Sequence, residues 1–216
     1  MTKISSHILE KLRTIDTPTV CNLVEHFNLR PYNTGYMDAS IKACFPEMPP
    51  MVGFALTLTF RSSSPPPENT ALTLADLAVE IENMINKIGP PIIVVQDLDD
   101  PTVAATFGEI MCTKCKTFGA VGLITSGAGR DINQVRSLDF PVFTSGTICA
   151  HAYCHLIEVN VPVNVGGITI CPNNLLHGDL NGVTTIPHEI AEELAEMSDE
   201  YLEKEKHTLA AIRREK

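Results

Sequence analysis

The sequence predicts a single α/β domain spanning residues 1–216. Short apolar runs at 92–95 and 121–124 are bounded by glycine or proline and are too short for helices, as is typical of buried strands in a parallel sheet. Helical spacing of apolar residues precedes them, at 74–88 and from about Thr106 to Phe118. Strands that alternate with helices indicate crossover connections, and therefore an α/β fold.

Composition and charge indicate which partners and which cellular compartment to expect. The chain is 44% hydrophobic and carries a net charge of −10, and its only cluster of basic residues is at 213–216. We therefore expect no nucleic-acid partner. No apolar run approaches the roughly 18 residues of a membrane span, and the start is polar, so we expect no membrane partner and a cytoplasmic protein. The seven scattered cysteines indicate reduced thiols.

The first 60 residues predict two helices, a loop and a strand. Apolar side chains recur at helical spacing in 8–15, after two serines that can act as N-caps. Pro18 suits the first turn of a second helix, where its missing N–H is not needed. Residues 28–50 are polar and contain several prolines, so we expect a loop or flap. In 54–60 large apolar side chains alternate with small or polar ones, which predicts a half-buried strand.

The remaining elements follow from the same rules. Residues 131–143 are expected to form a short helix and then a strand. Alternating valines at 159–165 and apolar residues at 168–170 flank the pair Gly166-Gly167, which predicts a hairpin. The last helix, over 188–216, has one apolar face and many glutamates on the other, as expected for packing or oligomerisation.

The stretch 119–131, GAVGLITSGAGRD, is the best candidate for chemistry. Glycines in the turn 126–129 can adopt positive φ, which would let backbone amides converge on an anion as a nest. Arg130 offers a guanidinium fork that matches a carboxylate, and Asp131 offers an oxygen ligand for a hard divalent cation. An anionic substrate chelated to a metal would use both.

Three other motifs resemble functional sites but can be explained without one. The C-x-x-C spacing at 112–115 lies within a predicted helix and has no second pair, so we interpret it as structural. His151 and His155 are four apart and would share a helical face, with cysteines nearby; a separate transition-metal site there is left open. The loop at 127–129 lacks a third glycine, since Ile132 takes that position, so we exclude a dinucleotide cofactor.

The combination of segments resembles the RraA-like proteins, a family that includes the class II 4-hydroxy-4-methyl-2-oxoglutarate aldolases and the regulator of ribonuclease activity A. The resemblance runs from about residue 8 to 187. The segments on which the resemblance depends are Val52-Gly53, IIVVQD at 92–97, FGEIM at 107–111, GAVGLITSGAGRD at 119–131, FPVFTSG at 140–146 and the run at 159–187. It implies a central β/β/α sandwich of the swivelling-domain type, with N-terminal helices and a C-terminal amphipathic helix, assembled into homotrimers or hexamers with active sites between subunits.

The resemblance also implies site residues. In the aldolases a quartet at a helix start binds the pyruvyl carboxylate, and it matches Gly108, Glu109, Ile110 and Met111. Arg130 matches the substrate clamp, and Asp131 matches the ligand of Mg²⁺ or another divalent cation such as Mn²⁺. Glu109 matches the carboxylate that orients a metal-bound water, the candidate general base.

The implied reaction is cleavage of a carbon–carbon bond in a small 2-oxo acid through a pyruvate enolate. Retro-aldol cleavage of 4-hydroxy-4-methyl-2-oxoglutarate and decarboxylation of oxaloacetate both pass through this enolate, which a metal and Arg130 would stabilise. No lysine Schiff base is required.

The alternative function is a non-catalytic RraA-like regulator that binds another protein. Regulators of the family tend to lack the Asp after the Arg, so Asp131 favours the enzyme. Asn181 stands where the family usually has a second Asp, which leaves room for the regulator. The aldolases also borrow a carboxylate from a neighbouring subunit, and four glutamates are candidates for it: Glu189, Glu192, Glu193 and Glu196.

Overall fold

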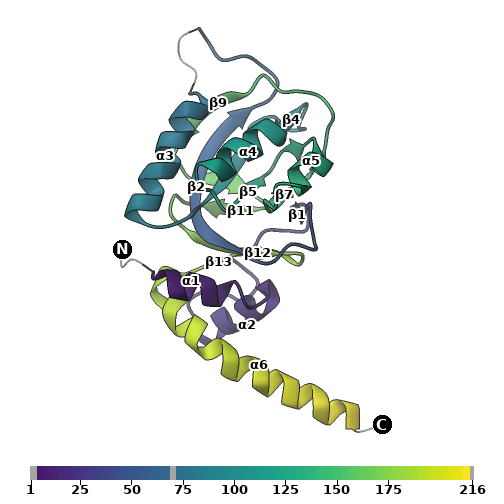
Figure 1. The fold of residues 1–216 in the computed structure, drawn as a ribbon. Coiled ribbons are helices and arrows are strands. Elements are labelled where there is room, and N and C mark those ends of the chain that lie inside the picture. Colours follow the sequence, from purple (N-terminus) through teal and green to yellow (C-terminus); the bar gives the residue numbers. More distant parts are fainter. Residues whose placement is uncertain (1–3, 69–71, 215–216) are drawn as a thin grey trace.

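The computed structural model describes residues 4–68 and 72–214, and its centre is a mixed sheet of eight strands (Figure 1). Seven follow the order β1-β7-β5-β3-β2-β12-β13, and β9 also pairs with β2. The strands are β1 Lys42–Ala43, β2 Met51–Arg61, β3 Pro91–Asp97, β5 Gly122–Thr125, β7 Val142–Thr144, β9 His155–Val159, β12 Leu175–Asp179 and β13 Gly182–Ile186. Strands β2, β3, β5 and β7 are parallel, and the others pair antiparallel.

Helices connect the parallel strands, as the sequence predicted. They are α3 Leu74–Lys87, α4 Glu109–Thr117 and α5 Ile132–Arg136. Helix α3 begins at a capping box, in which Thr73 and Asp76 satisfy each other's backbone N–H groups. The predicted α/β class is confirmed as a mixed α/β fold.

Helix α4 starts later than predicted. Residues from about Thr106 were expected to be helical, but Ala105–Phe107 form β4 instead. Strand β4 pairs with β6 (Ala128–Gly129), and β6 pairs with β8 (Gly146–Thr147), so these short strands make a second, three-stranded sheet. Phe107 is buried and Gly108 is extended, with φ −154°, so the chain enters the helix only at Glu109.

Strand β2 is buried on both faces, so the prediction of a half-buried strand was wrong. Phe54 and Leu56 face one hydrophobic cluster, and Ala55 faces a second. The second cluster is covered by the hairpin of β10 (Val163–Val165) and β11 (Ile168–Ile170), which the sequence predicted correctly. Small residues alternate with large ones in β2 because the hairpin packs closely on that face, not because the face meets water.

The loop at 28–50 is irregular except for β1, and it is anchored to the body. Met37, Ile41 and Phe45 are buried in the two clusters. The Arg30 guanidinium donates to the carbonyl oxygen of Thr185 at 2.9 Å. The segment is therefore a packed loop.

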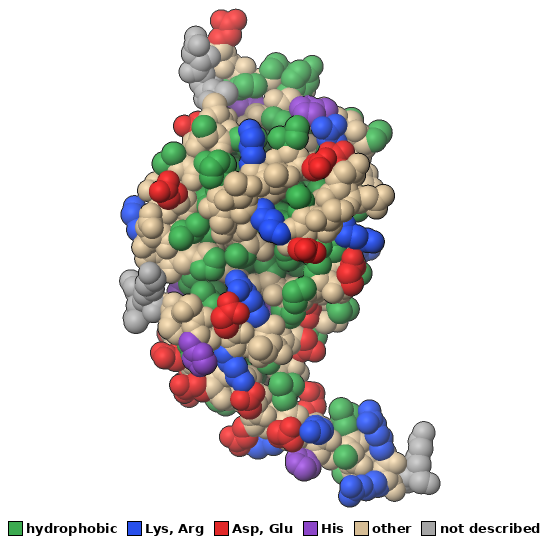
Figure 2. Space-filling view, viewed as in Figure 1, with side chains coloured by type: hydrophobic (Ala, Val, Ile, Leu, Met, Phe, Trp, Pro, Cys, Tyr) green, Lys and Arg blue, Asp and Glu red, His purple; other side chains and the backbone are tan. Residues whose placement is uncertain are grey.

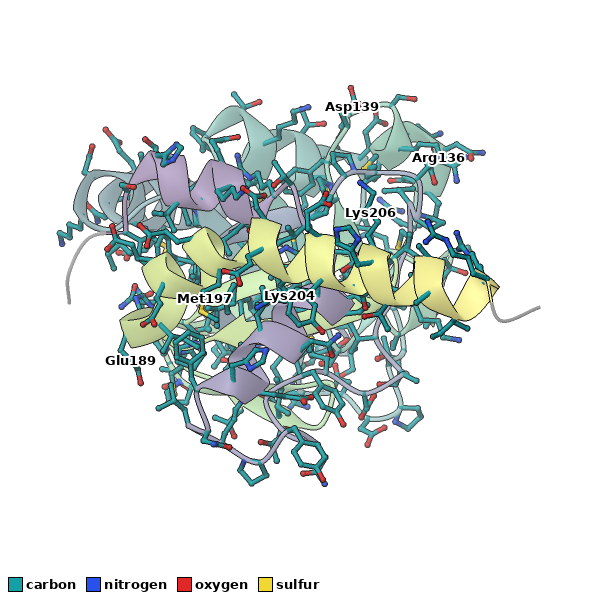
Figure 3. The ribbon with its side chains drawn as sticks, turned by 90° about the horizontal axis from the view of Figure 1, so that it is seen from below. Arg136, Asp139, Glu189, Met197, Lys204 and Lys206 are labelled. Atoms are coloured by element: carbon teal, nitrogen blue, oxygen red, sulfur yellow. The ribbon has the colours of Figure 1, made fainter. Side chains whose placement is uncertain are left out.

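The N-terminal helices and the C-terminal helix form a separate layer. These are α1 Ser6–Leu12, α2 Thr17–His26 and α6 Ala191–Arg214, the last preceded by the 3₁₀ turn η1 His188–Ile190. The caps are Ser5 for α1 and Asp16 for α2. Figure 3 shows α6 passing α1 and α2, and Figure 1 shows its far half extending beyond the body. Residues 215–216 of the predicted last helix lie outside the described residues.

Two further expectations concern the whole chain. All seven cysteines are free. Within the part of the chain that the structure describes, no helix has the length and apolarity that crossing a bilayer requires.

A buried histidine fastens the helical layer to the sheet. His177 of β12 is fully buried, and its Nε2–H donates to the carbonyl oxygen of Leu12 at 3.0 Å. Because that carbonyl can only accept, Nδ1 of the neutral ring accepts from the Thr17 hydroxyl at 3.0 Å. The Asp179 carboxylate accepts the Thr17 N–H at 3.0 Å and the Asn181 N–H at 2.8 Å. Asp179 and Asn181 therefore stabilise a turn and the start of α2.

This arrangement predicts a stability that falls in mild acid. Burial lowers the pKa of His177, so the unfolded chain takes up the proton first as the pH falls. The free energy of unfolding should therefore drop by about 1–2 kcal/mol between about pH 7 and pH 5. In His177→Gln the drop should be smaller, although the variant is less stable at pH 7. The exposed His7, changed to Gln, serves as the control in urea unfolding. An unchanged pH dependence in His177→Gln would contradict this role.

Candidate functional site

A cavity of about 380 Å³ lies where the second sheet meets α4 and α5. Its polar lining residues are Thr73, Thr106, Gly108, Arg130, Asp131, His151 and Cys154. Its apolar lining residues are Phe60, Leu72, Leu74, Ala105, Phe107, Ile110, Met111, Ala152 and Leu156. The volume lies at the lower end of the range of about 300–1,000 Å³ for small-molecule sites.

Arg130 and Asp131 enter this cavity directly after β6. The backbone N–H of Arg130 donates to the carbonyl oxygen of Phe107 at 3.1 Å, which fixes the end of β6 against β4. Asp131 is the N-cap residue of α5 and has a left-handed backbone with φ 57°. Nε of Arg130 lies 3.7 Å from Oδ2 of Asp131, and the two side chains are 31% and 34% exposed. Both charges are thus available to a ligand.

The start of α4 meets this pair. The backbone N–H of Glu109 donates to Oδ2 of Asp131 at 3.1 Å. Gly108 makes the contact possible, because a Cβ at this position would lie 2.6 Å from that oxygen and 3.2 Å from Nε of Arg130. Gly108 also provides no side-chain cap. The first-turn N–H groups of Ile110 and Met111 have no partner within the helix, and an anion can bind at such a terminus.

The structure therefore brings together two motifs that are 22 residues apart. Gly108, Ile110, Met111, Arg130 and Asp131 all line the cavity. Glu109 contributes its N–H to Asp131, while its side chain is exposed. The roles of these residues in binding substrate and metal remain predictions.

The expected anion nest in the turn at 126–129 is wrong. Neither Gly127 nor Gly129 has a positive φ, and Gly129 belongs to β6. A Cβ on Gly129 would lie 2.1 Å from the Phe107 ring, and one on Gly127 would lie 2.0 Å from the Thr106 hydroxyl. The glycines permit close packing of β6 on β4, and the free amides belong to α4 instead.

Sequence reasoning missed a buried carboxylate behind the cavity. Asp97 ends β3, is 8% exposed, and accepts the Asp99 N–H at 3.0 Å and the Thr106 hydroxyl at 3.4 Å. Burial raises the pKa of Asp97. An Asp at the carboxyl end of a parallel strand, as in IIVVQD, is the signal that could have identified it.

The other candidates for metal chemistry do not assemble. Cys112 and Cys115 are buried in α4, and burial raises the pKa of both, that of Cys115 to about 12, so they remain thiols. His151 and His155 share no helical face, because His155 begins β9 and His151 forms an isolated bridge with Ala105. Among residues 4–68 and 72–214, no three His, Cys, Asp or Glu side chains form a group that could hold a metal.

Known proteins resemble this chain in sequence and in fold. A family model described as RraA-like: Aldolase/RraA matches residues 17–185. A Halalkalibacterium halodurans protein, provisionally named a 4-hydroxy-4-methyl-2-oxoglutarate aldolase, is 37% identical over 99 residues. An uncharacterized protein of Methanocaldococcus jannaschii is 34% identical over 104 residues. These matches cover 45% and 47% of this chain, and the chain spans about half the length of these curated relatives, 47% and 50% respectively.

Solved structures match over nearly the whole chain. RraAS2 of Streptomyces coelicolor, described as an unusual member of the RNase ES inhibitor RraA protein family, has a TM-score of 0.73 and 22% identity. The match covers 96% of this chain and 98% of that one. An uncharacterized protein from Pseudomonas syringae has a TM-score of 0.75 and 23% identity, with coverage of 99% and 91%. At this identity the likeness shows the fold alone: a mixed α/β fold with a long C-terminal helix.

The geometry of Asp131 predicts an order of stabilities. Asp131→Ala should lower the free energy of unfolding by about 1–2 kcal/mol, because the Glu109 N–H loses its acceptor. Asp131→Gly should lose about 0.5–1 kcal/mol less, since glycine adopts φ 57° without strain. Asp139, with φ 47° and an exposed carboxylate that caps no helix, is the control for the backbone effect in urea unfolding. A glycine variant at 131 less stable than the alanine variant would contradict this account.

Proposed function

The chain belongs to the RraA-like family, and on this premise we propose that it is a divalent-metal-dependent lyase that cleaves a carbon–carbon bond of a small 2-oxo acid through a pyruvate enolate. The observation that carries the proposal is the meeting of Arg130, Asp131 and the start of α4 at one cavity. Substrates of the 4-hydroxy-4-methyl-2-oxoglutarate and oxaloacetate types both yield this enolate.

The substrate carboxylate would bind between α4 and Arg130. The unpartnered N–H groups of Ile110 and Met111 and the positive end of the helix favour an anion. Arg130 can bind the same carboxylate through two parallel N–H donors, or lie against the 2-oxo oxygen as that atom gains negative charge. The enolate is the more negative form at that oxygen, so a fixed guanidinium there favours bond cleavage.

Asp131 is the proposed ligand of Mg²⁺ or Mn²⁺. Its carboxylate is a third exposed, and Mg²⁺ is usually held by one or two carboxylates together with substrate oxygens and water, so a single protein carboxylate fits. When bound, the ion supplies Lewis-acid stabilisation of the 2-oxo group. Glu109 would take up and return a proton through water from the first turn of α4. None of the described lining residues is a lysine, so the proposal includes no Schiff base.

We further propose a cytoplasmic homo-oligomer, a trimer or hexamer, with no nucleic-acid or membrane partner. The far half of α6 supports self-association, because Leu202, Leu209 and Ile212 are exposed there at heptad-like spacing. Acidic side chains crowd the start of α6 and basic ones its end, as Figure 2 shows. In a hexamer with two-fold axes, an antiparallel second copy of α6 would place each basic end beside an acidic start.

A non-catalytic regulator is the competing function. The sequence feature that left room for it was Asn181, which the structure places in the β12–β13 turn, outside the lining of the cavity. Because Asn181 does not line the cavity of this chain, we retain the regulator only as the outcome of a negative enzyme assay.

Enolisation can be tested without knowing the natural substrate. We expect the wild type with Mg²⁺ to exchange the methyl protons of pyruvate in D₂O, measured by ¹H NMR, and to release pyruvate from suitable 2-oxo acids. Chelation, Arg130→Lys and Asp131→Asn should each slow the exchange by at least about 100-fold. Chelation and Asp131→Asn remove the metal that stabilises the enolate, and Arg130→Lys keeps the charge but loses the paired N–H donors of the guanidinium. Arg136→Lys is the matched control, since Arg136 pairs with Glu47 and does not line the cavity. If no exchange above background occurs with Mg²⁺ or Mn²⁺, the regulator becomes the better proposal.

Self-association has its own test. The double variant Leu209→Glu with Ile212→Glu should reduce the mass measured by light scattering, because buried carboxylates would replace apolar contacts. His207→Glu, on a different face of the same exposed helix, should leave the mass unchanged. An unchanged mass in the double variant would exclude α6 as the contact.

A further inference from the structure

The cavity offers a single strong cation. Among its described lining residues Arg130 is the only lysine or arginine. In the proposed function Arg130 is occupied by the pyruvyl carboxylate or its 2-oxo oxygen. A second carboxylate on the substrate would therefore find no further lysine or arginine among the described lining residues of this chain.

Four apolar lining residues, which we call the apolar wall, come from segments other than those that carry Arg130 and Asp131. Phe60 and Leu156 are buried side chains from the ends of β2 and β9, and Leu72 and Leu74 flank the start of α3. An isolated bridge between Leu72 and Leu156 joins two of these segments. In Figure 1, β9 and the start of α3 lie at the upper left, whereas β4 and α5 lie to their right. The apolar wall and the charged pair thus come from different parts of the fold.

The size of the cavity also favours a substrate with an apolar group beyond its pyruvyl unit. A pyruvyl unit has six non-hydrogen atoms and would leave most of about 380 Å³ unfilled. The remaining space is bounded mainly by aliphatic and aromatic side chains. An apolar group placed there loses contact with water, which favours binding. A carboxylate placed there would lose its hydration without gaining a partner, which opposes binding.

We therefore propose that the substrate of this site is a 4-hydroxy-2-oxo acid with a single carboxylate and an aliphatic or aromatic group on C4. This inference rests on the proposed function and specifies its substrate class. In the cleavage the C3–C4 bond breaks, its electron pair forms the pyruvate enolate, and the C4 hydroxyl loses its proton. The products are an apolar aldehyde or ketone and, after C3 takes up a proton from water, pyruvate.

Among the described residues that line the cavity, His151 is the one other basic side chain. It is exposed, so a carboxylate bound to it would remain in water instead of occupying the apolar wall. His151→Ala measures its contribution directly: the variant should keep the ligand preference of the wild type.

Two ligands of equal chain length test the inference. 2-Oxopentanoate ends in a methyl group where 2-oxoglutarate ends in a carboxylate. We expect calorimetry in the presence of Mg²⁺ to show at least about tenfold tighter binding of 2-oxopentanoate. Equal binding, or tighter binding of 2-oxoglutarate, overturns the inference.

A cation introduced into the apolar wall should remove or reverse the preference for 2-oxopentanoate over 2-oxoglutarate. Leu74→Lys places a cation at the half-buried start of α3 and should bring the two affinities together or favour 2-oxoglutarate. Val79→Lys adds the same charge to an exposed position of α3 that does not line the cavity, and should keep the wild-type ratio. A wild-type ratio in a folded Leu74→Lys variant would show that the apolar wall does not contact the ligand, and would overturn the inference.

Different experimental outcomes overturn the lyase activity and the substrate class. Pyruvate exchange without a preference for 2-oxopentanoate supports the lyase and overturns the substrate class. A clear preference without exchange supports an apolar monocarboxylate ligand for the cavity and overturns the lyase.

Discussion

The hydrogen bond from the Glu109 N–H to Asp131 is the contact on which the candidate site depends. It joins the start of α4 to the start of α5, two helices that follow different strands of the small second sheet. The contact requires a residue without a side chain at 108 and a left-handed residue at 131, and both conditions are met. Once it forms, the carboxylate, the guanidinium and the free amides of α4 must face one cavity.

The small sheet fixes the geometry of that contact. Strand β6 is only two residues long, yet Gly129 lies against the Phe107 ring so closely that no side chain could be accommodated. The Arg130 N–H then binds the Phe107 carbonyl oxygen, so the backbone is fixed immediately before both charged residues. Behind this sheet the Asp97 carboxylate accepts the Thr106 hydroxyl, and the Asp97 N–H donates to Ser126 Oγ at 2.9 Å. The charged pair therefore rests on backbone that is fixed from two directions, which limits how far a ligand can displace it.

The sequence was sufficient for elements whose signals are local. Apolar spacing and short apolar runs predicted the three crossover helices and the parallel strands, and the paired glycines predicted the β10–β11 hairpin. It was insufficient where tertiary packing decides. The small polar residues of β2 suggested water on one face, but the hairpin covers that face. Gly127 and Gly129 suggested a nest, but their role is set by Thr106 and Phe107, which belong to a different strand, β4. The meeting of Gly108 with Asp131 came from the family resemblance, because no local rule links residues so far apart.

The apolar wall shows why a motif alone cannot define a substrate. Its members come from the ends of β2 and β9 and the start of α3, and none is part of the segments that carry the charged residues. Charge stabilisation and shape selection are therefore separate in this fold. Substitutions at the start of α3 can change the bulk and polarity of the wall without altering the contact between Glu109 and Asp131. Under the proposed function, members of the family could share one way of stabilising an enolate and differ in the group that they accept on the other side of the cleaved bond.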